Sequence, residues 1–106
     1  MNRNNILKSS RSIDHVINKG KKINTNFLFI TYVSKPSDSK IAIAVSKKLG
    51  NAVHRNKLKR QIRNILIAVD VESFNKWVVI VPKKHWLDLT FEQKSNELIN
   101  SLNKIT

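Results

Sequence analysis

The apolar run at residues 77–81 (WVVIV), which Pro82 ends, is the feature that most constrains the fold of this chain. A strand with one face in water alternates apolar and polar residues, whereas a strand covered on both faces is apolar throughout. We therefore expect a central strand here, in a sheet that helices pack against around one core.

Two other segments, 27–33 (FLFITYV) and 41–45 (IAIAV), predict strands from their aromatic and β-branched content. The segment between them contains Pro36 and is typical of a turn. We expect these two strands to pair as an antiparallel hairpin, and residues 21–24 to add a short strand before it.

Helices are predicted before, between and after these strands. The first spans about 9–18, and Gly20 is placed to end it in a left-handed conformation. Its apolar stripe fits either core packing or an exposed patch. The stripe contains Ile13, Val16 and Ile17. The second helix spans about 52–69. Its apolar face contains Leu58, Ile62, Ile65, Leu66 and Val69.

The last predicted helix begins at Thr90, which forms a T-x-x-Q capping box with Gln93. Its apolar face contains Phe91, Leu98, Leu102 and Ile105. The resulting order is α-β-β-(β)-α-β-α, which predicts an α+β fold with an antiparallel or mixed sheet and three helices.

The length of 106 residues leaves no room for a second core, so we expect one domain over 1–106. The sequence has no cysteine, which excludes disulfides and thiolate metal sites. Its apolar runs have the length of strands, far short of a membrane span. We expect a soluble, cytoplasmic protein without a membrane partner.

The distribution of charge indicates a polyanionic partner. Twenty Lys and Arg residues against seven Asp and Glu residues give a net charge of +13, which favours nucleic acid first and an anionic membrane surface second. The alternative is a surface that is generally rich in lysine, but this would not explain why no acidic residue occurs between Asp38 and Asp70. This window contains Lys40, Lys47, Lys48, Arg55, Lys57, Lys59, Arg60 and Arg63.

At 100° per residue, the helix predicted at 52–69 buries its apolar side and turns Asn56, Arg60 and Arg63 outward. Other cations crowd its N-terminal end, where the helix dipole is already positive, and they destabilise the helix there. A bound phosphate would remove this conflict, because it would meet free backbone N–H groups, the dipole and the cations together. The alternative is a solvated basic face, although the acidic residues that usually pair such charges at i+4 are missing.

The order of residues over 47–63 (KKLGNAVHRNKLKRQIR) resembles the signature of the bacterial ribonuclease P protein, K-x-G-N-A-V-x-R-N-R-x-K-R-x-x-R. The residues that match in register are Gly50, Asn51, Ala52, Val53, Arg55, Asn56, Lys59, Arg60 and Arg63. Lys57 stands where the signature has its second arginine, which keeps the charge but loses a bidentate fork. Length and element order fit the family over most of the chain, while only residues 45–63 are specific.

This resemblance implies a left-handed βαβ crossover leading to the strand at 77–81, whereas pattern alone favours a right-handed connection. It implies one subunit of a ribonucleoprotein, a heterodimer of one protein and one catalytic RNA, which removes the 5′ leader from precursor tRNA. Mg²⁺ would act at the active site of the RNA, and the protein alone would bind no cofactor. The implied RNA-binding residues are Lys47, Lys48, Asn51, Arg55, Asn56, Lys57, Lys59, Arg60 and Arg63.

The resemblance also implies that a cleft between the first helix and the sheet holds the single-stranded leader. The candidate contacts are Ile13, Ile17, Phe27, Phe29 and Tyr32. Family members often carry aromatic residues where Ile13 and Ile17 stand, and isoleucine does not stack on a base as an aromatic ring does. Strand alternation places Phe27 and Phe29 on one face and Tyr32 on the other, and leaves open which face forms the cleft.

Two other classes of function fit the sequence less well. A catalytic protein would need clustered carboxylates or paired histidines, yet the seven acidic residues form no D-x-D or E-x-x-E pair and the three histidines lie far apart in the sequence. We therefore predict no catalytic and no metal-binding side chains. The main alternative is a non-catalytic ribosomal or other structured-RNA-binding protein, or a DNA-binding module.

Overall fold

The computed structural model describes residues 5–105, so the ends of the predicted domain, 1–4 and 106, lie outside the described residues. One four-stranded mixed sheet has the order β1-β2-β4-β3. Its strands are β1 (Lys21–Asn24), β2 (Leu28–Ser34), β3 (Lys40–Ile43) and β4 (Lys76–Pro82). The helices are α1 (Ser10–Lys19), α2 (Ala52–Leu66) and α3 (Phe91–Asn103). Short 3-10 turns are η2 (Lys47–Leu49), η3 (Val71–Ser73) and η4 (Lys84–Asp88). The α+β class and the element order are confirmed.

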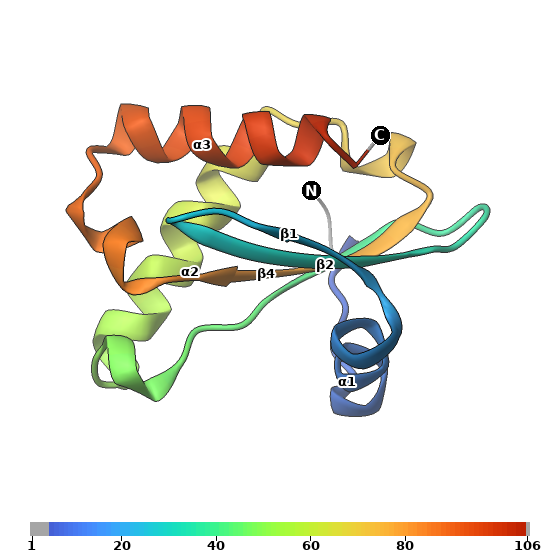
Figure 1. Cartoon of the computed structure of the whole chain (residues 1–106), viewed down its shortest axis with the longest axis horizontal. Coiled ribbons are helices and arrows are strands. Elements are labelled where there is room, and N and C mark those ends of the chain that lie inside the picture. The colour runs from blue at the N-terminus through green and yellow to red at the C-terminus, as the bar shows by residue number, and fades with distance from the viewer. Residues whose placement is uncertain (1–4, 106) are drawn as a thin grey trace.

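Strand β4 is central and is covered on both faces, as its apolar run predicts. Figure 1 shows α1 on one side of the sheet and α3 on the other. Val78 and Ile80 belong to the main core, which includes the apolar faces of α2 and α3. Val79 belongs to a smaller cluster with Val16 of α1 and Ala42 of β3. All three β4 side chains are fully buried.

The predicted hairpin between the second and third strands is wrong, because β4 lies between β2 and β3. β4 pairs antiparallel with β2 and parallel with β3. A strand that is apolar on both faces is best covered inside a sheet, where neighbours on both edges also pair its backbone N–H and C=O groups. The parallel neighbour needs a crossover, which α2 provides. The short strand β1 does form a hairpin with β2. The left-handedness of this crossover stays a prediction from the family resemblance.

Two helix details differ from expectation. Gly20 ends α1 in an extended conformation (φ −76°, ψ 162°) and not in the left-handed one. Glycine is needed there because a Cβ atom would lie 2.5 Å from the carbonyl oxygen of Val16 and 2.7 Å from that of Tyr32. Phe91 is 55% exposed, although the sequence pattern places it on the buried face of the last helix. The fully buried Trp86 of η4 fills the main core beside the start of α3 instead.

Lys94 of α3 is a buried cation between α2 and α3. Its Nζ donates a hydrogen bond to Oε1 of Gln61 at 3.2 Å and lies 5.9 Å from the centre of the Trp86 ring. Within residues 5–105 it has no acidic partner. Burial first, and the positive charge of Lys57 second, lower the pKa of Lys94 below its ordinary value of 10.5. Protonated Lys94 therefore costs stability in the folded state.

The amino group of Lys94 binds a proton more readily in the unfolded chain than in the folded protein. Protonated Lys94 therefore lowers the unfolding free energy below its folded pKa, and this destabilisation decreases as the pH rises towards 10.5. We expect the unfolding free energy of the wild type to rise relative to that of Lys94→Met over this range, in urea titrations at a series of pH values. Lys104→Met, which changes an exposed lysine, is the control and should show no such trend. A difference between wild type and Lys94→Met that does not change with pH would contradict this account.

Candidate nucleic-acid interface

The turn into α2 is built by three residues. Ser46 caps η2, since its Oγ accepts a hydrogen bond from the backbone N–H of Lys48 at 3.2 Å. Gly50 has φ +136°, a conformation that favours glycine, and a Cβ there would lie 2.7 Å from the His54 ring. Asn51 then caps α2, and its Oδ1 accepts a hydrogen bond from the N–H of His54 at 2.9 Å. The lysines of η2 are thereby held next to the first turn of α2.

Helix α2 is amphipathic in the predicted sense. Its buried residues are Leu58, Ile62, Ile65 and Leu66. Of the nine predicted RNA-binding residues, Arg55 and Lys59 are half-buried at the edge of the apolar face and the other seven are exposed, as the helical wheel indicates. We call these nine residues the basic surface: Lys47, Lys48, Asn51, Arg55, Asn56, Lys57, Lys59, Arg60 and Arg63.

The charges of the basic surface are not compensated by acidic side chains. Among residues 5–105, the ion-pair contact is that of His85 with Asp88 at 3.5 Å, which lies in η4. The first turn of α2 holds no acidic residue. In addition, Nε of Arg55 is buried without a hydrogen-bond partner. These cations therefore lower helix stability in the free protein. Clustered cations without acidic partners are typical of sites that bind phosphate groups.

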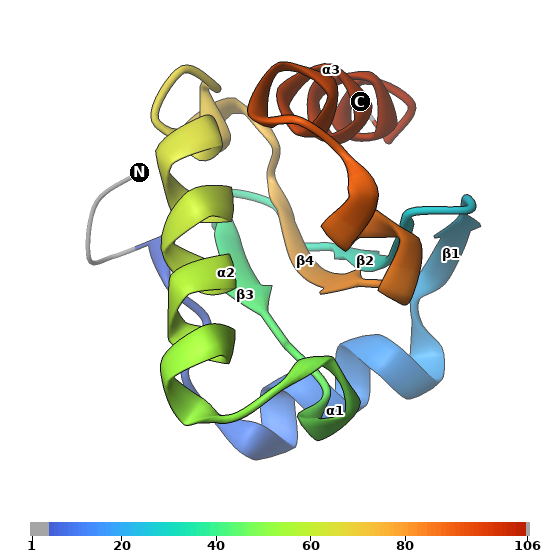
Figure 2. The same ribbon diagram turned by 90° about the vertical axis from the view of Figure 1, so that its left-hand side faces the viewer.

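The structure brings the basic surface together with α1. Lys59 and Arg63 line a hollow of about 200 Å³ with Ile13 of α1 and with Ile41, Ala42 and Ile43 of the β3 strand. Figure 2 shows α2 standing beside β3, with α1 passing below. We call this hollow the cleft. It combines cations on one wall with apolar side chains on the other, an arrangement suited to a single nucleic-acid strand.

Two residues that line the cleft were missed by the sequence analysis. Ile6 forms a parallel bridge with Ile41, and the N–H of Leu7 donates to the carbonyl oxygen of Ile41 at 2.9 Å. The segment before α1 thus adds to the free edge of β3. The signal in the sequence was an apolar pair within an otherwise polar N-terminal stretch.

The candidate leader contacts do not all face the cleft side of the sheet. Ile13 and Ile17 are half-buried against the smaller apolar cluster, which also includes Val81. Phe29 pairs with Val81 and so shares this face. Phe27 and Tyr32 pack against the main core on the opposite face.

The expectation that Phe27 and Phe29 share a face is therefore wrong. β2 begins at Leu28, so strand alternation does not extend back to Phe27. Phe27 lies instead in a turn, where its N–H donates to Oγ1 of Thr25 at 3.2 Å.

Metal-binding clusters and membrane-spanning helices are both missing from residues 5–105. This part of the chain contains no group of three or more His, Asp or Glu side chains placed to hold a metal ion. None of its helices combines the length and the apolar character that a membrane span requires.

Comparison with known proteins gives one consistent result. A family model described as Ribonuclease P matches residues 1–106. The ribonuclease P protein component of Finegoldia magna is 38% identical, over 92% of this chain and 88% of that protein. That of Mycoplasma mycoides subsp. mycoides is 38% identical over 99% of both chains. The solved structure of the Staphylococcus aureus RNase P protein is similar with a TM-score of 0.79, 26% identity and coverage of 93% of each chain.

Asn51→Asp separates the structural role of this position from binding. Aspartate caps a helix as well as asparagine does, and its negative charge interacts favourably with the positive end of the helix dipole and with the nearby cations. We therefore expect the free energy of unfolding to rise by about 0.3–1 kcal/mol. Affinity for RNA should fall, because the carboxylate would stand where we predict that a phosphate binds. Thermal denaturation and RNA titration measure the two effects, with Asn100→Asp at an exposed position of α3 as a control of equal charge change. Higher stability with unchanged affinity would rule out a phosphate at the start of α2.

Proposed function

Because this chain belongs to the family of ribonuclease P protein components, which act in tRNA processing, we propose that its basic surface binds the catalytic RNA subunit and that its cleft receives the 5′ leader of precursor tRNA. One protein and one RNA form the complex. The RNA carries out the cleavage with Mg²⁺ at its own active site, and the protein contributes binding and positioning.

The observation that carries this proposal is the set of unpaired cations around a capped helix start. Guanidinium groups match phosphate oxygens with a planar fork, and lysines add point charges. Helical RNA hides its base edges in a deep, narrow groove, so a protein recognises it mainly through its shape and its phosphates. Helix α2, with Arg60 and Arg63 exposed and the lysines of η2 next to its first turn, fits such a target. RNA binding would also relieve the repulsion that these charges cause in the free protein.

The assignment of the leader to the cleft follows from its two unlike walls. Lys59 and Arg63 supply charge for the phosphates of an extended strand. On the apolar wall, Ile13 offers contact area without aromatic stacking. Phe29 is the predicted aromatic candidate on the α1 face of the sheet, outside the lining of the cleft. Leader recognition in this chain then rests more on phosphate contacts than on stacked bases, and so depends strongly on salt.

Reconstitution tests the proposed function. Purified protein is added to a bacterial ribonuclease P RNA at low Mg²⁺ together with precursor tRNA, and 5′ processing is measured. We expect processing to rise, because the cations of the protein replace part of the charge screening that Mg²⁺ otherwise provides. Binding to the RNA without any rise in processing would favour the alternative, a structured-RNA-binding protein with no part in cleavage.

Arg60→Ala tests the phosphate contacts of the basic surface. We expect several-fold weaker binding to the RNA subunit, and a slope of log K against log salt that is smaller by about 0.7–0.9 for each phosphate that the variant no longer binds. Lys104→Ala, which removes one exposed charge beyond the end of α3, controls for net charge and should leave the slope nearly unchanged. An equal slope for wild type and Arg60→Ala would remove Arg60 from the set of phosphate-binding residues.

A further inference from the structure

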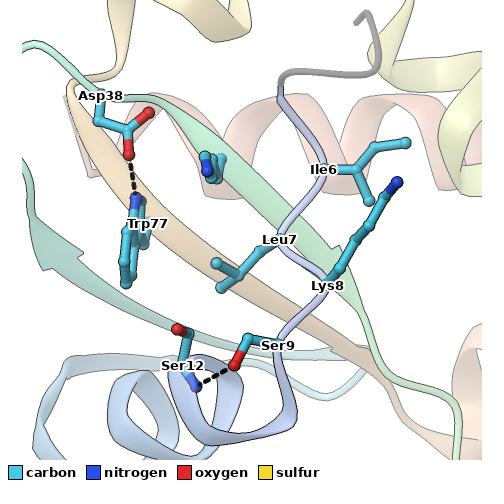
Figure 3. Close-up of a pocket in the computed structure, with 8 residues that line it drawn as sticks. Ile6, Leu7, Lys8, Ser9, Ser12, Asp38 and Trp77 are labelled. Atoms are coloured by element: carbon cyan, nitrogen blue, oxygen red, sulfur yellow. Dashed lines mark hydrogen bonds between the residues drawn. The ribbon is translucent and has the colours of Figure 1, made fainter.

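A second hollow, of about 530 Å³, lies on the α1 side of the sheet, between the segment before α1 and the first residues of β3 and β4. Figure 3 shows Trp77 on one side of it, Leu7 and Lys8 across from Trp77, and Ser9 and Ser12 below. Ile6, Asp38 and Lys40 complete the lining. None of these residues belongs to the basic surface. Ile6 and Leu7 line both this hollow and the cleft, so the two sites are separated only by that segment.

Trp77 gives this hollow a flat aromatic wall held in a defined orientation. Its Nε1 donates a hydrogen bond to Oδ2 of Asp38 at 2.9 Å. The same bond engages the one acidic side chain in the lining. Trp77 is half-buried, in contrast with the neighbouring β4 residues Val78 and Val79, which are fully buried. The indole is thus anchored at its polar atom while part of its surface stays open.

Cations surround this aromatic wall. Nζ of Lys35 lies 4.3 Å from the centre of the Trp77 ring, and Nζ of Lys40 lies 6.0 Å from it. Lys8 lies on the opposite wall, where its side chain extends alongside Ile6 (Figure 3), and Ser9 and Ser12 add hydroxyl groups at the start of α1. The first turn of α1 contains no acidic residue. A ligand that fits this environment has a flat aromatic part and an anionic part.

We propose that this hollow binds one unpaired nucleotide, with its base against Trp77 and its phosphate between Lys8, Lys40 and the start of α1. The inference rests on the proposed function, since RNA supplies the nucleotide. Two RNAs offer the same chemistry: the catalytic RNA subunit and the stretch of leader that leaves the cleft past Ile6 and Leu7. Tryptophan stacks on any base, so the site would accept a nucleotide without strong preference for sequence.

The test uses the reconstituted holoenzyme and two affinities, that of the protein for the RNA subunit and that of the holoenzyme for precursor tRNA with long or short leaders. We expect Trp77→Leu to weaken one of them by at least about fivefold, and Trp77→Phe, which keeps a ring, to weaken it by less than about twofold. Lys8→Ala should weaken the same affinity and reduce its salt dependence, whereas the control Lys104→Ala should not. A loss confined to long leaders assigns the nucleotide to the leader, and a loss of RNA-subunit affinity assigns it to the catalytic RNA.

Because Trp77 also packs on the smaller apolar cluster, circular dichroism is used to check that Trp77→Leu is folded. If this variant does not fold, the affinities of Lys8→Ala and Lys104→Ala are compared to test the proposal. A photo-crosslinking residue in place of Ser12 provides the direct reading, and a crosslink to one RNA nucleotide is expected. The inference is overturned if folded Trp77→Leu binds like wild type, or if Lys8→Ala matches Lys104→Ala and no crosslink forms. Wild-type protein that fails to raise processing would instead overturn the proposed function.

Discussion

The burial of β4 on both faces is the constraint on which the rest of this structure depends. Val78 and Ile80 require a cover on one face and Val79 on the other, and each such side chain contributes roughly 1.5–3 kcal/mol when it is removed from water. A chain of 106 residues meets both requirements with α2 and α3 on one side and α1 on the other. The Trp77 hollow lies on the side that α1 covers, and the cleft lies at the β3 edge of the sheet, where residues of α1 and α2 come together.

In the basic surface, the charges that suit a polyanionic partner also lower the stability of helix α2. The apolar face of α2 holds the helix in place, and the cap at Asn51 stabilises its first turn. The cations of η2 and α2 oppose the helix dipole and each other, with no acidic partner among the described residues. Charge repulsion also acts on a buried residue, since the positive charge of Lys57 contributes to the lowered pKa of Lys94. A polyanion bound to this surface, as proposed for the RNA subunit, would offset these costs.

The segment before α1 links the two hollows. Its backbone pairs with Ile41 at the edge of the sheet, so Ile6 and Leu7 form a wall between the cleft and the Trp77 hollow. Trp77 at the start of β4 and Lys59 on α2 are thereby placed on opposite sides of one short strand-like segment. An RNA strand that follows the α1 side of the sheet would meet cations first and an aromatic ring further on.

The sequence by itself determined the local features, because these depend on residues close together in the chain. They include the Asn51 cap, the Thr90 capping box, the buried and exposed faces of α2, and the signature over 47–63 that places the chain in its family. Only the tertiary structure decided which strands are neighbours. The expected hairpin between β2 and β3 is absent because β4, which is apolar on both faces, lies between them at a position where helices cover both of its faces. Likewise Lys59 and Ile13 line one hollow, and Trp77 and Lys8 line another, although they are far apart in the sequence and no local pattern predicts this. These hollows arise from the packing of distant segments around the sheet, which is a property of the whole core.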